Sequence, residues 1–96
     1  DIGRDVPDVS EKLGCFYFCN RQWRKSREVL GEAPRTTEGI FCMAIMKKYG
    51  HGGQRDRKKG IELIRLAKEG KGLFALLAKI VWAGWYKEDR DKINGE

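Results

Sequence analysis

Residues 37–70 read TEGIFCMAIMKKYGHGGQRDRKKGIELIRLAKEG and carry the clearest structural pattern in the chain. Apolar side chains recur three and four positions apart on both sides of a glycine-rich turn, which predicts two helices joined by a tight link. Thr36 or Thr37 is predicted to cap the first helix and Asp56 the second, because side-chain oxygens accept hydrogen bonds from the free amides at a helix start. The inward stripe of the second helix is predicted to comprise Ile61, Leu63, Ile64, Leu66 and Ala67.

The segments on either side predict three further helices. Residues 8–20 begin with an acidic cap and a glutamate three positions later, and residues 23–33 end before Pro34. Within 23–33, Val29, Leu30 and Ala33 are expected to point inward. The last helix is expected over residues 73–86, with an extension to Glu88 left open.

Only residues 15–19 show real strand propensity. They lack a credible partner strand, so we expect them to be helical. Five short helices with short links predict an all-α fold of antiparallel neighbours.

The 96 residues are enough for one domain. We divide this domain, 1–96, by its helical pattern. The divisions are a divergent first helical hairpin over 8–34, a repeat-like hairpin over 37–70, an apolar terminal helix over 72–88 and a tail over 89–96.

A weak internal repeat links these segments. Shifting the chain by 34 positions places similar residues on each other, a period typical of helix-turn-helix solenoids. The matching pairs are Lys25 with Lys59, Val29 with Leu63, Leu30 with Ile64, Ala33 with Ala67, Ala44 with Ala78 and Gly50 with Gly84.

About half of the chain resembles the Sel-one-like repeat, a relative of the tetratricopeptide repeat. The matching residues are Tyr49, Gly50, Gly52, Gly53, Asp56, Lys59, Ala67 and Gly70, followed by Ala75, Ala78, Gly84, Asp89 and Lys92. The turn is about two residues shorter than that family's, Gly60 stands where alanine is usual, and Lys68 replaces a second alanine. The resemblance implies an α-solenoid whose members act mainly as adaptors, scaffolds and binding modules, some bacterial ones in toxin immunity.

Charge is concentrated in the middle of the chain. The net charge is +6, and residues 21–71 hold 14 bases and six acids, whereas residues 1–20 hold two bases and four acids. Two basic clusters lie about 34 positions apart, so a solenoid would align them as one basic ridge facing an acidic partner. The predicted basic ridge comprises Arg21, Arg24, Lys25, Arg27, Lys47, Lys48, Arg55, Arg57, Lys58 and Lys59. An ordinary solvated face is the alternative interpretation.

The stretch 73–86 is apolar on all sides, with a single lysine, and is too short to span a membrane. Such a helix needs cover on both faces, from the N-terminal helix folding back or from another chain. We therefore predict a partner-binding aromatic set of Trp82, Trp85 and Tyr86, and a homodimer through 72–88 as one option. Trp23, which lies among the arginines of the ridge, is added to this set, with packing at the start of its own helix as the alternative.

The residues capable of catalysis or metal binding are few. Cys15, Cys19, Cys42 and His51 are formally four zinc ligands, but their spacing fits no tight zinc site, so no metal or cofactor is predicted. A bridge between Cys42 and either other cysteine stays open, and buried reduced thiols in the cytoplasm are favoured over a periplasmic or secreted setting. The glycine turn lacks the Gly-Lys-Ser/Thr ending of a phosphate loop.

Together these observations predict a non-catalytic protein-protein interaction module, of the adaptor, inhibitor or immunity type. The alternative is a small basic protein that binds nucleic acid, since the clustered cations would also attract phosphates. A cysteine-dependent enzyme ranks third, because the sequence places no base beside a thiol.

Overall fold

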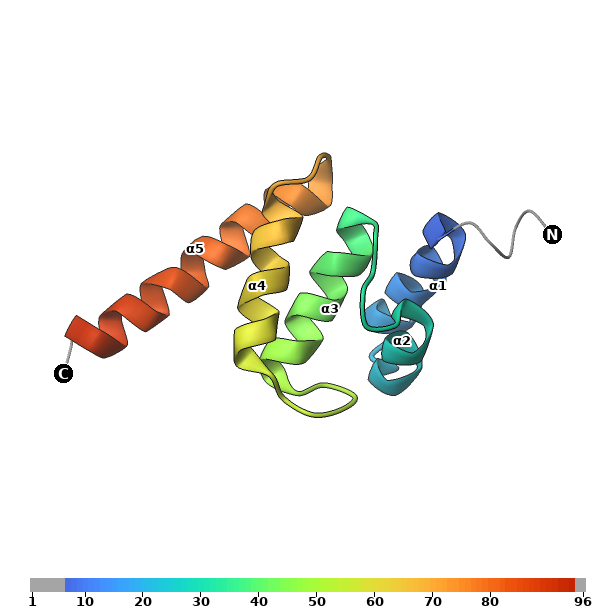
Figure 1. Cartoon of the computed structure of the whole chain (residues 1–96), viewed down its shortest axis with the longest axis horizontal. Helices are drawn as coiled ribbons and strands as arrows, with labels where there is room; N and C mark the ends of the chain where they lie inside the picture. The colour runs from blue at the N-terminus through green and yellow to red at the C-terminus, as the bar shows by residue number, and fades with distance from the viewer. Residues whose placement is uncertain (1–6, 95–96) are drawn as a thin grey trace.

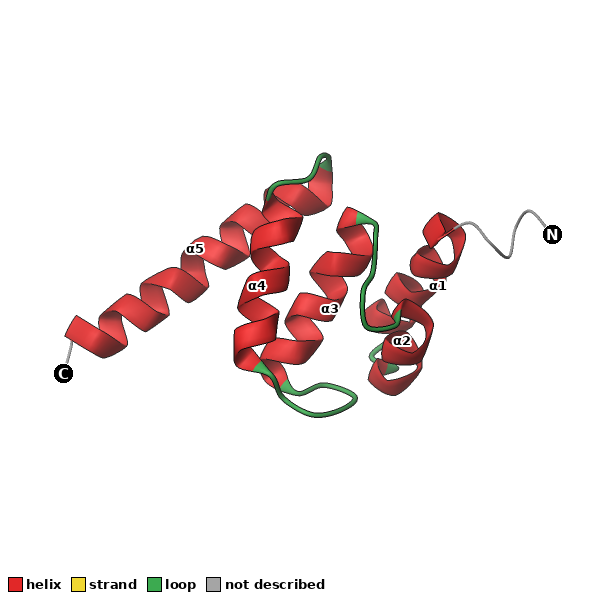
Figure 2. Cartoon of the chain, in the orientation of Figure 1, coloured by secondary structure: helices red, strands yellow, loops and turns green. Residues whose placement is uncertain are grey.

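The computed structural model describes residues 7–94, which form five helices (Figure 1). They are α1 (Pro7–Cys19), α2 (Trp23–Leu30), α3 (Thr37–Tyr49), α4 (Arg57–Lys68) and α5 (Leu73–Asn94). Figure 2 shows that all regular structure in this described part is helical, including the segment with strand propensity at the end of α1. The predicted all-α fold with five helices is therefore confirmed.

Helices α3 and α4 form the centre of the molecule. They pack against each other along most of their lengths, with α1 and α2 on one side and α5 on the other (Figure 1). Helix α1 contacts α2 and α3, and α5 contacts α4 and α3. Helices α1 and α5 do not touch, so the N-terminal helix does not fold back to cover α5.

The starts of α3 and α4 are held by the capping residues that the sequence predicts. The Thr36 hydroxyl accepts a hydrogen bond from the Gly39 amide at 3.0 Å, and the Asp56 carboxylate accepts one from the Lys59 amide at 3.1 Å. Gly50 ends α3 with a φ of 77°, a left-handed conformation that glycine adopts without a steric penalty. Both caps and the glycine turn are confirmed, with Thr36 as the residue that caps α3.

Both helical hairpins bring their backbones together at a small residue. In the first hairpin, the Ser26 hydroxyl donates to the carbonyl oxygen of Gly14 at 2.7 Å. In the second, a Cβ on Gly60 would lie 2.8 Å from the Lys48 amide nitrogen and 2.9 Å from the Ala44 carbonyl oxygen. The sequence shift of 34 carries Ser26 onto Gly60 and Gly14 onto Lys48, so the two hairpins approach closely at corresponding positions.

The core lies between the central pair and its neighbours. Its buried apolar members are Leu30, Cys42, Met43, Ala44, Met46, Leu63, Ile64, Ala67, Ala78 and Trp85. One residue of the predicted inward stripe is wrongly placed: Leu66 is 59% exposed. Gly60, Ile64 and Ala67 follow the spacing of the buried face of α4, and Leu66 lies on a different face.

Three predicted helix boundaries differ from those observed. Helix α2 ends at Leu30 because Gly31 adopts a φ of 73°, so Ala33 is exposed rather than inward. Helix α1 begins at Pro7, one position before the predicted start. Helix α5 continues to Asn94, so most of the predicted tail is helical, and residues 95–96 lie outside the described part.

Candidate binding surface

The side chain of Arg27 holds the α3–α4 link against α2. Its Nε donates to the His51 carbonyl oxygen at 2.8 Å, and its Nη2 donates to the carbonyl oxygens of Met46 at 3.0 Å and Gln54 at 3.1 Å. Partial burial lowers the pKa of the guanidinium below its ordinary value. This predicted member of the basic ridge is therefore occupied within the chain.

Trp23 contacts the same link. Its ring stacks on the imidazole of His51, with centroids 4.5 Å apart and planes 16° apart, and the edge of Phe18 contacts it at 5.3 Å. A Cβ on Gly52 would lie 2.6 Å from the backbone carbon of Trp23, so only a glycine allows the link to come this close. The predicted partner-binding Trp23 instead joins the two hairpins and is half-buried.

Lys48 and Trp85 are both interior residues, each 5% exposed. The Lys48 Nζ lies 4.6 Å from the centroid of the Tyr49 ring and 4.7 Å from that of Trp85. The indole Nε1 of Trp85 donates to the Tyr49 hydroxyl at 3.1 Å. An ammonium between two aromatic faces is stabilised by their negative potential, so these three residues attach α5 to α3 and leave neither Lys48 nor Trp85 for a partner.

The other basic residues near α2 remain at the surface, whereas the side chain of Lys47, at the end of α3, is only 13% exposed. Arg21, Arg24 and Lys25 are exposed, and the Lys25 Nζ lies 5.7 Å from the centroid of the Tyr17 ring. Lys47 forms an ion pair with the exposed carboxylate of Glu32 at 3.5 Å.

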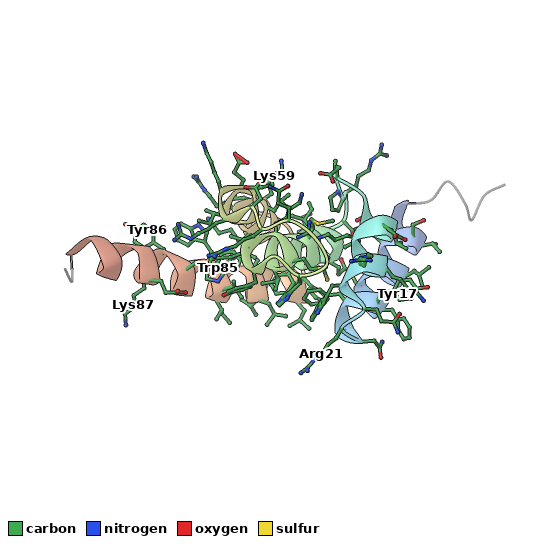
Figure 3. The ribbon with its side chains drawn as sticks, turned by 90° about the horizontal axis from the view of Figure 1, so that it is seen from below. Tyr17, Arg21, Lys59, Trp85, Tyr86 and Lys87 are labelled. Carbon is green, nitrogen blue, oxygen red and sulfur yellow. The ribbon has the colours of Figure 1, made fainter. Side chains whose placement is uncertain are left out.

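The second of the two predicted basic clusters lies around the start of α4 and comprises Arg55, Arg57, Lys58 and Lys59. Arg55 and Lys58 are exposed, and Arg57 and Lys59 are partly exposed. The Arg55 Nε donates to the Lys48 carbonyl oxygen at 3.1 Å. Figure 3 shows Arg21 and Lys59 pointing to opposite sides of the molecule. At these two residues the clusters do not join into one ridge.

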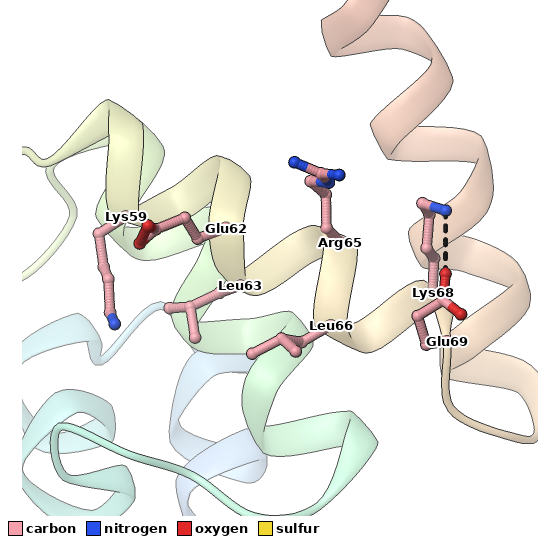
Figure 4. A pocket seen from close by; sticks show the side chains of 7 residues that line it. All are labelled: Lys59, Glu62, Leu63, Arg65, Leu66, Lys68 and Glu69. Carbon is pink, nitrogen blue, oxygen red and sulfur yellow. Dashed lines mark hydrogen bonds and ion pairs between the residues drawn. The ribbon is translucent and has the colours of Figure 1, made fainter.

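A shallow groove of about 530 Å³ follows the outer face of α4 (Figure 4). It is lined by Lys59, Glu62, Leu63, Arg65, Leu66, Lys68 and Glu69. Lys59, Leu63 and Leu66 point the same way in Figure 4, whereas Arg65 points the other way. The groove therefore combines an exposed leucine with Lys59 at one end and, at the other, an ion pair of 3.2 Å between Lys68 and Glu69.

This groove was not predicted, because the helical pattern of α4 assigns Leu66 to the core. A signal was present: positions 59, 62, 63, 66 and 69 follow a helical spacing of their own, and they combine two leucines with three charged residues.

Helix α5 presents a second apolar surface. Leu73, Leu76 and Ile80 are exposed on it at helical spacing. Trp82 is half-buried and stacks on the exposed ring of Tyr86, with centroids 5.4 Å apart. This row of three aliphatic residues has no cover from any described helix.

The groups capable of chemistry are dispersed. Cys42 is buried beside Cys15, with 3.3 Å between the two sulfur atoms, whereas Cys19 is exposed. His51 lies in the α3–α4 link, stacked on Trp23. Among the described residues, no three histidine, cysteine or carboxylate side chains converge as a metal ion would require.

Within residues 7–94, no helix has both the length and the apolar character needed to cross a membrane. The chain matches no protein-family model, no curated protein and no solved structure.

Proposed function

We propose that this chain is a non-catalytic protein-binding module that docks an acidic, partly apolar segment of a partner along α4. The observation that carries this proposal is the groove on α4, where Leu66 is 59% exposed between Lys59 and Lys68. Binding a partner would remove the exposed apolar surface of Leu66 from water, which contributes affinity. The cations around the groove would orient an acidic partner and speed its approach.

The charge of the surrounding surface supports an acidic partner. Arg55, Lys58 and Arg65 are exposed on or beside α4, and residues 21–71 carry a clear excess of bases. The resemblance to Sel-one-like repeats, whose members are mainly adaptors and binding modules, points to the same class of function. We place the module in a reducing compartment such as the cytoplasm, because three cysteines are an odd number and cannot all pair within one chain.

A protein partner is favoured over nucleic acid by the arrangement of the charges. A duplex is bound through many phosphates, which requires a continuous basic face. Here Arg27 and Lys48 are occupied inside the chain, and Arg21 and Lys59 point to opposite sides (Figure 3).

The proposal is tested with a fluorescein-labelled short peptide that alternates glutamates with leucines, and with a labelled DNA duplex of matched charge. Anisotropy titrations at about 150 mM salt compare the wild type with Lys59→Glu and Leu66→Ser. We expect each substitution to weaken peptide binding by about tenfold, equivalent to about 1.4 kcal/mol.

Two matched controls separate the groove from general surface effects. Lys58→Glu changes the neighbouring exposed lysine, which does not line the groove, and Leu73→Ser changes an exposed leucine on α5. Both should bind the peptide within about twofold of the wild type, since less than 0.5 kcal/mol is at stake. If the wild type and Leu66→Ser bind the duplex equally well and neither binds the peptide, nucleic-acid recognition would replace this proposal.

We also propose that α5 forms a homodimer through the face that carries Leu73, Leu76 and Ile80, because these three side chains are exposed together. Apolar surface of this kind is removed from water when a second copy covers it. Sedimentation velocity should show a concentration-dependent dimer for the wild type and a monomer for Ile80→Asp. A wild type that sediments as a monomer at every concentration would refute the homodimer and leave the α4 groove untouched.

A further inference from the structure

Cys15 and Cys42 form a thiol pair between two helices that are not neighbours in sequence. Cys42 lies in α3, is 1% exposed, and directs its thiol at the sulfur of Cys15 in α1 at 3.3 Å. Cys15 is only partly buried, so it is the more accessible of the two residues. Cys19 lies one helical turn further along α1 and is exposed.

We propose that Cys15 and Cys42 are a reversible oxidation site, at which a peroxide reacts first with Cys15 and Cys42 then closes a disulfide between α1 and α3. The sulfur atoms must approach by about 1.3 Å to reach the disulfide bond length of about 2.0 Å. This proposal is independent of the binding function assigned to α4.

The two thiols differ in a way that sets this order of reaction. The hydrogen bond from Cys42 lowers the pKa of the Cys15 thiol below its ordinary value, which favours the reactive thiolate. The same hydrogen bond, together with burial, raises the pKa of the Cys42 thiol, which keeps it protonated. Cys15 is thus the accessible nucleophile, and Cys42 is held beside it, away from solvent.

The reaction balances with a peroxide as the oxidant. The Cys15 thiolate attacks one oxygen of hydrogen peroxide, the O–O bond breaks, and the hydroxide that leaves takes a proton to become water. Cys15 is then a sulfenic acid. Cys42 loses its proton and attacks the Cys15 sulfur, the S–S bond forms, and the S–O bond breaks to release a second water. Two thiols lose two electrons, and an external thiol reverses the change.

The first experiment treats the wild type and Cys19→Ser with one equivalent of hydrogen peroxide. We expect the intact mass of the monomer to fall by about 2 Da, the mass of two hydrogens, and proteolytic mapping to join Cys15 to Cys42. Excess dithiothreitol should restore both thiols. Closing the 27-position separation should also raise the melting temperature by about 15 °C. A bridge to Cys19, or oxidation that leaves Cys42 as a free thiol, would overturn the proposal.

The second experiment tests the order of reaction in the Cys19→Ser background. Cys42→Ser removes the second thiol, so the sulfenic acid on Cys15 should persist and be captured by dimedone. Cys15→Ser should leave Cys42 unreacted over the same period, because it is buried. Dimedone labelling of Cys42 in the Cys15→Ser variant, or no labelling of Cys15 in the Cys42→Ser variant, would contradict the proposed order. The proteolytic mapping of the wild type tests the disulfide itself.

Discussion

The Nε of Arg27 donates to the carbonyl oxygen of His51 at 2.8 Å, across 24 positions of sequence. This contact joins α2, in the first hairpin, to the turn of the second hairpin. The turn has few apolar side chains of its own, so it depends on this arginine and on Trp23 for its position. A residue with the appearance of a surface cation thus holds the two hairpins together.

Replacing Arg27 by alanine should lower the free energy of unfolding by about 2–3 kcal/mol, because three carbonyl oxygens lose a charged donor. Arg24→Ala, at an exposed position of the same helix, should change it by less than about 0.5 kcal/mol. Urea denaturation followed by circular dichroism measures both. Equal stability of the two variants would mean that Arg27 does not hold the link in solution.

Gly60→Ala should destabilise the protein by about 1–3 kcal/mol, although alanine is the better helix former. The added methyl would meet the backbone of Lys48 and Ala44 on α3, which cannot move aside without separating the helices. Gly84→Ala is the matched control. A Cβ on Gly84 meets nothing within 4 Å, so this variant should gain about 0.5–1 kcal/mol. Thermal melts of the two variants should therefore shift in opposite directions.

Lys48→Glu should destabilise the protein by about 3 kcal/mol or more, because it buries a carboxylate against the faces of Tyr49 and Trp85. Lys48→Met keeps the length of the side chain and should remain within about 1.5 kcal/mol of the wild type. Lys58→Glu, at an exposed position, is expected to be near neutral. Denaturant midpoints rank the three, and a Lys48→Glu variant as stable as Lys58→Glu would disprove the buried position of this lysine.

Glu11→Ala should cost about 2–4 kcal/mol, because the buried carboxylate accepts hydrogen bonds from the Arg35 amide at 2.7 Å, the Thr36 amide at 2.7 Å and the Thr36 hydroxyl at 2.5 Å. Both amides would lose their partner next to the start of α3. Glu32→Ala, which removes only an exposed ion pair with Lys47, should cost about 0–1 kcal/mol. Chemical denaturation of the two glutamate variants makes the comparison, and a smaller effect at Glu11 than at Glu32 would be inconsistent with the observed contacts.

Local patterns in the sequence predicted the helices and the caps of α3 and α4 well. Asp56 and Thr36 accept hydrogen bonds from amides three positions away, and Gly50 ends α3 through its own backbone conformation. These features depend on neighbouring residues only, so a local pattern is enough to predict them.

The predicted acidic cap of the first helix was wrong, because α1 begins at Pro7 and the Glu11 carboxylate bonds residues 35 and 36. The predicted end of α2 at residue 33 was wrong, because it rested on Pro34 as the stop signal. The left-handed backbone of Gly31 ends the helix three positions earlier.

Contacts between distant segments were not predictable in the same way. Lys48 becomes an interior residue only because α5 brings Trp85 over it, and Arg27 leaves the surface only because the α3–α4 link folds back toward α2. Leu66 is exposed because the buried face of α4 is already provided by Gly60, Ile64 and Ala67. Residue types alone do not predict whether these positions are buried. The burial of each face depends on which helix packs against it.

The contacts of Glu11 with residues 35 and 36 also determine how the molecule opens. Helices α1 to α4 are linked by this carboxylate and by Arg27, so they should exchange their amide hydrogens as one cooperative unit. Helix α5 rests on α3 and α4 through one face. Helix α5 should therefore detach alone and exchange its amide hydrogens first. Local unfolding should then begin where Trp85 packs against Lys48 and Tyr49.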